Sequence, residues 1–95
     1  MIIETSNIPL HEAIHRFLVA NGLVKDWADL ARRVNRSRSY FSTLKRTSSE
    51  PSDDVWMSLT KYMTGLLVNS QNDGIKRWLG YYIKQIEFHV MGISS

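Results

Sequence analysis

The sequence predicts a small all-α domain, a compact arrangement of five helices. In five segments apolar residues recur at spacings of three and four, and residues typical of caps and turns separate these segments. Sustained period-two alternation, the pattern of a half-buried strand, is missing. The 95 residues fit one domain, which we place at 1–95.

The first two expected helices have clear start and stop residues. The first runs from Pro9, which suits a first helical turn, to Asn21, with Gly22 as its stop. The second begins at Asp26, an N-cap residue, and ends at Asn35, which tolerates the left-handed backbone of a tight turn. Their inward stripes are Leu10, Ile14, Phe17 and Leu18, then Trp27, Leu30, Ala31 and Val34.

The third expected helix runs from Ser37, as its N-cap, to about Lys45. One side carries the apolar residues Tyr40, Phe41 and Leu44. The opposite side carries Arg38, Ser39, Ser42, Thr43 and Lys45. This helix therefore has one face for the core and one short-chained, cationic face for solvent or a partner.

The last two expected helices are the longest. The fourth starts at Ser52 or Asp53 and runs to Val68, and the fifth spans Ile75 to Met91. The core stripe of the fourth is Val55, Trp56, Leu59, Tyr62, Met63, Leu66 and Leu67, and that of the fifth is Ile75, Trp78, Leu79, Tyr82, Ile83, Ile86 and Val90.

Positive charge is concentrated in residues 25–46. This segment holds seven of the twelve basic residues and only two of the nine acidic ones, whereas the rest of the chain is slightly acidic. A cationic face on a near-neutral body is typical of a phosphate-binding surface, and the alternative is an ordinary solvated helix surface.

Residues 30–46 resemble the helix-turn-helix of phage lambda repressor and Cro-like regulators, and the likeness extends over about residues 10–68. The residues that match the family pattern are Leu30, Ala31, Ser37, Phe41, Ser42 and Leu44. Asn35 stands where the family has a turn glycine, and Thr47 stands where many members carry glycine. The resemblance implies a helix-turn-helix core at 26–46 and a transcription regulator that inserts helix 37–45 into the major groove of double-stranded DNA.

Roles for individual residues follow from their positions in that motif. The candidates for contacts with base edges are Arg38, Ser39, Ser42 and Thr43. The candidates for phosphate contacts are Arg32, Arg33, Arg36, Lys45, Arg46 and Trp27. For Trp27, packing in the core is an equally good interpretation.

The fifth helix is the candidate dimer interface. A single recognition helix reads few base pairs, so such regulators usually bind two half-sites as homodimers. Tyr81 and Phe88 lie with Arg77 and Lys84 on the side opposite the core stripe, where aromatic residues indicate a partner surface. The alternative is that helix 75–91 only completes the core.

A rival motif is His11-Glu12-Ala13-Ile14-His15, a literal zinc-protease pattern. Pro9 places it in the first turn of its helix, Arg16 follows the second His, and the third His, His89, is not spaced as a ligand. We therefore expect a non-enzyme without metal or cofactor, in which both histidines border the core.

The second candidate function is a protein-interaction module, such as an antirepressor, antitoxin or inhibitor, built on the same fold. It would bind a protein partner through exposed apolar residues instead of DNA. The chain has no cysteine and no apolar run of membrane-spanning length, and its first residues lack a signal-peptide pattern. We expect a cytoplasmic protein, and by analogy a phage or mobile-element origin.

Overall fold

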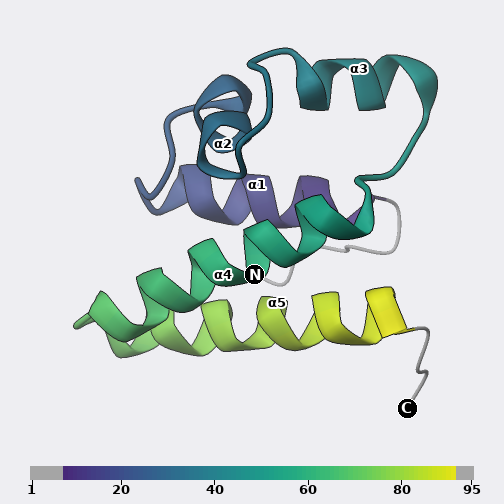
Figure 1. The fold of residues 1–95 in the computed structure, drawn as a ribbon. Coiled ribbons are helices and arrows are strands. Elements are labelled where there is room, and N and C mark those ends of the chain that lie inside the picture. Colours follow the sequence, from purple (N-terminus) through teal and green to yellow (C-terminus); the bar gives the residue numbers. More distant parts are fainter. Residues whose placement is uncertain (1–7, 92–95) are drawn as a thin grey trace.

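In the computed structural model, which describes residues 8–91, the chain forms five α-helices and no strand (Figure 1). The all-α class and the number of helices are therefore confirmed for this range, and residues 1–7 and 92–95 lie outside it. The helices are α1 (Leu10–Ala20), α2 (Trp27–Arg33), α3 (Tyr40–Thr47), α4 (Asp53–Asn69) and α5 (Asp73–Met91).

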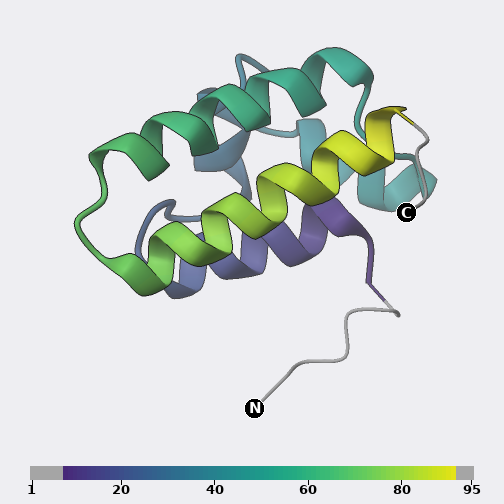
Figure 2. The ribbon, with the colours of Figure 1, turned by 90° about the horizontal axis from the view of Figure 1, so that it is seen from below.

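The two long helices α4 and α5 form an antiparallel hairpin, and the shorter helices pack around it (Figures 1 and 2). Helix α1 lies along α5, α2 packs on α4, and α3 packs on α2. The centre of the core is Trp56, Leu59 and Met63 of α4 with Ile14 and Leu18 of α1, Leu30 of α2 and Leu79 of α5, all at most 2% exposed. This arrangement leaves α3 at the edge of the molecule.

Two aspartates accept backbone N–H groups at the start of helix α2. The N–H of Asp29 donates to the carboxylate of N-cap Asp26 at 2.9 Å, as expected for this residue. The N–H of Lys25 in turn donates to the carboxylate of Asp29 at 2.9 Å. This pair differs from a standard capping box, where the second carboxylate accepts from the N-cap residue itself. Both contacts satisfy N–H groups at the entrance to α2.

Three helices in succession end on the same backbone motif, a left-handed residue after the last turn. The left-handed residues are Gly22 (φ 70°) after α1, Asn35 (φ 61°) after α2 and Ser48 (φ 54°) after α3. In each case the next N–H bonds back to a carbonyl five residues earlier, at 2.8 to 2.9 Å. The expected stops at Gly22 and Asn35 are confirmed, while the third lies at Ser48, one residue beyond Thr47.

Helices α2 and α5 each have one boundary that differs from the expected one, and α3 differs at both ends, Tyr40 and Thr47. Helix α2 ends at Arg33, because the turn that closes on Asn35 already includes Val34. Helix α5 begins at Asp73, two residues early, because the side chain of Asn72 accepts the N–H of Ile75 at 3.0 Å and so caps an earlier first turn.

Replacing Ser48 with glycine should stabilise the protein. The left-handed backbone at this position is strained for serine, whose Cβ crowds the neighbouring carbonyl, and unstrained for glycine. We expect Ser48→Gly to raise the free energy of unfolding by about 0.5–1 kcal/mol, measured by urea denaturation. The neighbouring Ser49→Gly, which gains no such relief, should leave it unchanged or lower it. A lower free energy of unfolding for Ser48→Gly would contradict the role of this position.

Candidate functional site

Helix α3 is held by two inward side chains. Phe41 and Leu44 are 3% and 8% exposed. The ring of Phe41 lies 5.0 Å from that of Trp27 and 6.2 Å from that of His11, measured between ring centroids. Because these contacts all lie on one side, the opposite side of α3 is free of the core.

The start of α3 differs from the expectation that Ser37 caps it. The first helical residue is Tyr40, and the N-cap position is Ser39, whose side chain makes no capping hydrogen bond. The reason is a separate turn before the helix, in which the carbonyl of Ser37 accepts the N–H of Tyr40 at 3.0 Å. The hydroxyl of Tyr40 also accepts the N–H of Ser52 at 3.3 Å, which ties this turn to the start of α4.

The four side chains expected at base edges are all exposed. Ser42 and Thr43 lie in the first turns of α3, whereas Arg38 and Ser39 lie in the turn that precedes it. Helix α3 and its preceding turn therefore place all four within a six-residue stretch at the edge of the molecule.

The basic residues of this region divide into two groups. Asp29 pairs with Arg33 at 3.3 Å and with Arg32 at 3.6 Å, and Arg33 and Arg36 lie over the rings of Tyr62 and Tyr40. The N–H of Lys25 and then these arginines hold the pKa of Asp29 below its usual value. Within residues 8–91, no carboxylate pairs with Arg38, Lys45 or Arg46, which are all exposed.

Trp27, the first residue of α2, is packed against other aromatic residues. Its ring is stacked on that of His15, with centroids 3.6 Å apart and planes 5° from parallel, and it also contacts Phe41. The indole is half-buried. This is the placement that the core-packing interpretation of Trp27 expects.

The two histidines of the protease-like motif are part of this aromatic packing. His11 is 7% exposed and lies near the rings of Phe41 and Trp56, while His15 is covered by Trp27. Burial lowers the pKa of His11 and of His15, more than the nearby carboxylates raise them. Among the described residues, no three His, Cys, Asp or Glu side chains are placed to hold a metal ion.

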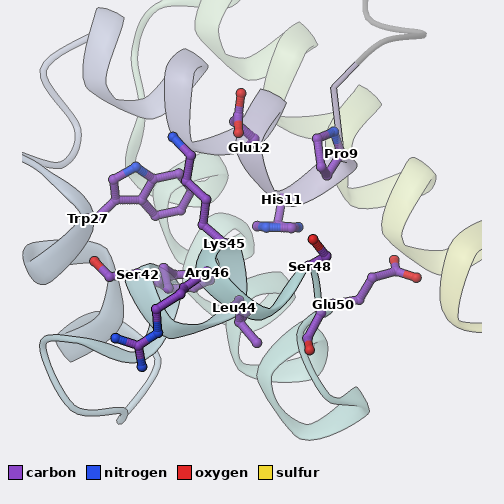
Figure 3. A pocket seen from close by; sticks show the side chains of 12 residues that line it. Pro9, His11, Glu12, Trp27, Ser42, Leu44, Lys45, Arg46, Ser48 and Glu50 are labelled. Carbon is purple, nitrogen blue, oxygen red and sulfur yellow. The ribbon is translucent and has the colours of Figure 1, made fainter.

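A pocket of about 790 Å³ lies between the start of α1, the start of α2, and α3 with the loop that follows it (Figure 3). Sequence reasoning did not identify this pocket, because its walls come from segments that are far apart in the chain. The lining residues are Pro9, His11, Glu12, Trp27, Phe41, Ser42, Leu44, Lys45, Arg46, Ser48, Ser49 and Glu50.

The outer face of α5 exposes more aromatic surface than expected. Tyr81 is 47% exposed, and Phe88 is half-buried, with Arg77 and Lys84 exposed beside them. Trp78, expected in the core stripe, is instead 50% exposed and packs on the rings of Tyr81 and Tyr82. The seven-residue spacing of Tyr81 and Phe88 places both on the same face of α5. The periodicity alone could not predict whether Trp78 faces the core or the solvent.

No protein-family model, curated protein or solved structure matches the chain. Within residues 8–91, no helix has the length and apolar character needed to cross a membrane.

The lowered pKa values of His11 and His15 predict a loss of stability in mild acid. As the pH drops below about 6.5, both histidines take up protons in the unfolded chain, whereas in the folded chain they stay neutral to lower pH. Protonation therefore favours the unfolded state, and the free energy of unfolding falls. Urea unfolding between about pH 7.5 and 5.5 should show this fall, and His11→Gln with His15→Gln should flatten it. An equally steep fall in the double variant would exclude these two groups as its source.

Proposed function

We propose that the protein is a sequence-specific DNA-binding transcription regulator, in which α2 and α3 act as a helix-turn-helix and α3 enters the major groove. The observation that carries the proposal is the division of α3 into a buried side, Phe41 and Leu44, and an exposed polar side. The major groove is wide enough to admit an α-helix, and a helix that is anchored by its buried side can insert its exposed side there. The resemblance to phage regulators supports the same activity, in the cytoplasm of a host cell.

The turn between α2 and α3 supports this arrangement. Asn35 takes the left-handed backbone that ends α2, and the six residues from Val34 to Ser39 lead to the start of α3. Residues at and before the N-terminus of a recognition helix are those that reach base edges in this mode of binding. Arg38 and Ser39 would therefore approach the groove from the turn, and Ser42 and Thr43 from the helix.

The ion pairs of the basic residues indicate which of them can contact phosphates most readily. Within residues 8–91, Lys45 and Arg46 pair with no carboxylate and can meet phosphates directly, whereas Arg32 and Arg33 must first leave Asp29. Exposed ion pairs are weak, at about 0–1 kcal/mol, so a DNA backbone can compete for both arginines. Each phosphate contact that forms releases counterions and makes binding sensitive to salt.

The test is selection from a pool of random-sequence duplexes at two salt concentrations. Wild type should enrich a defined motif in a salt-dependent way. Arg38→Ala should cost about 1–3 kcal/mol and relax the motif at one position, because a bidentate contact with guanine is lost. Lys45→Ala should weaken binding to all sequences and reduce the salt slope by about 1.

Lys61→Ala is the matched control, because Lys61 is an exposed lysine of α4 outside the proposed interface. It should bind like wild type. A wild-type protein that retains no duplex even at low salt would overturn DNA binding. A pull-down for an acidic protein partner would then test the protein-interaction alternative.

We also propose that the regulator binds DNA as a homodimer through the outer face of α5. Two copies related by a twofold axis match two half-sites on a duplex. Trp78 and Tyr81 form an exposed aromatic pair on α5, and their rings lie 5.5 Å apart. Aromatic residues are enriched at interface cores, and Arg77 and Lys84 would form the polar rim.

Tyr81→Asp should convert a dimer to a monomer, because it buries a carboxylate in the proposed interface. Sedimentation velocity measures the change. Met57→Asp, at a 59% exposed apolar residue of α4, is the control and should sediment like wild type. A Tyr81→Asp protein that also sediments like wild-type dimer would place the interface elsewhere.

A further inference from the structure

Two arginines near the proposed DNA-binding surface lie over tyrosine rings, and they differ in charge balance. The guanidinium of Arg33 is 5.5 Å from the ring centroid of Tyr62 and also pairs with Asp29 at 3.3 Å. The guanidinium of Arg36 is 5.9 Å from the ring centroid of Tyr40 and pairs with no carboxylate within residues 8–91. Arg36 therefore combines a restrained side chain with a charge that nothing in the described part of the chain compensates.

Arg36 also differs from the basic residues that follow it in the chain. It is half-buried, whereas Arg38, Lys45 and Arg46 are exposed and, within residues 8–91, none of these three lies over an aromatic ring. A guanidinium that lies over a ring can still use the N–H groups along its edge. The guanidinium of Arg36 donates no hydrogen bond to another described residue, so this edge is available to a ligand.

The ring of Tyr40 is itself fixed by three contacts. Its backbone N–H donates to the carbonyl of Ser37 at 3.0 Å, which closes the turn before α3. Its hydroxyl accepts the N–H of Ser52, the N-cap residue of α4, at 3.3 Å. Its ring meets the buried ring of Phe41 edge to face, with centroids 5.1 Å apart. The ring is therefore a rigid support beside the start of α3.

A restrained arginine binds a phosphate with a smaller loss of rotamer freedom than a mobile one. An exposed arginine side chain must be ordered when it binds, and this ordering weakens the contact. A guanidinium that a ring already restrains loses less freedom, and its planar fork of N–H groups matches two oxygens of a phosphate. Because Arg36 pairs with no carboxylate within residues 8–91, no ion pair has to break before it binds.

We propose that Tyr40 is a positioning residue, which holds Arg36 in place for a bidentate contact with a DNA phosphate beside α3. This inference rests on the proposed DNA-binding function, and it adds a residue that the helix-turn-helix pattern does not include. The hydroxyl of Tyr40 is engaged by Ser52, so Tyr40 acts through the arginine and not through a phosphate contact of its own.

A double-mutant cycle, measured as the Kd for a mixed-sequence DNA duplex at low salt, tests whether Tyr40 acts through Arg36. Arg36→Ala should weaken binding about five- to tenfold and reduce the salt slope by about 1, because a phosphate contact is lost. Tyr40→Leu should weaken binding about three- to fivefold, because the arginine is no longer restrained. The double variant should bind like Arg36→Ala alone, within about 1.5-fold, since the ring then has nothing to position. Tyr40→Phe, which keeps the ring, should weaken binding less than Tyr40→Leu.

Arg38→Ala is the matched control, because Arg38 lies two residues further along the same turn and contacts no ring within residues 8–91. Its effect on the Kd should add to that of Tyr40→Leu. Equal coupling of Tyr40 to both arginines would overturn the proposal, since Tyr40 would then support the turn as a whole. In the DNA-free ¹⁵N-labelled chain, the heteronuclear NOE of the Arg36 Nε–H group should exceed that of Arg38, and Tyr40→Leu should remove the difference.

The outcomes separate this inference from the proposed function. A wild-type chain that binds no duplex at low salt would overturn both. Salt-dependent binding in which the effects of Tyr40→Leu and Arg36→Ala are fully additive would overturn the inference alone. Equal mobility of the Arg36 and Arg38 side chains in the DNA-free wild type would also overturn it, and this comparison needs no variant that must fold.

Discussion

The position of α3 depends on the aromatic junction at Trp27. The indole stacks on His15 of α1 and contacts Phe41 of α3, so one side chain of α2 joins three successive helices. Helix α3 has only eight residues and two buried anchors, too little to fix its orientation alone. The cationic face, the turn at Arg38 and the pocket behind α3 are all positioned through this junction.

The junction also explains why a helix can begin with a protease-like pair of histidines and hold no metal-ligand cluster among the described residues. The two imidazoles serve as flat, weakly polar rings between larger aromatic ones. This use has a cost, since burial disfavours the charged imidazole and one nitrogen of each ring has no hydrogen-bond partner within residues 8–91. A purely apolar pair of side chains at these positions would pack without that cost.

Periodicity predicted the five helices well, because a long apolar stripe depends only on local sequence. Periodicity was less reliable for the ends of helices, where more than one residue could serve as the cap. Ser37 and Ser39 are both good caps, and the hydrogen bond of Tyr40 to Ser52, twelve residues away, favours the later start. The predicted exposure of Arg38 and Ser42 agrees with the structure. The pairs of Asp29 with Arg32 and Arg33 are i,i+3 and i,i+4 contacts on α2, which the helical spacing alone could have indicated. The pocket requires the tertiary fold, so no local pattern could reveal it.

The α4–α5 hairpin has a consequence for the order in which the chain gains and loses structure. Its two helices are long, adjacent in the sequence and joined by a three-residue connection, so their contacts close a small loop at little entropic cost. Helix α3 instead depends on partners in α1, α2 and α4. Hydrogen exchange should therefore be fastest in α3 and slowest in the hairpin, so that the cationic face of α3 belongs to the part of the fold that opens most readily.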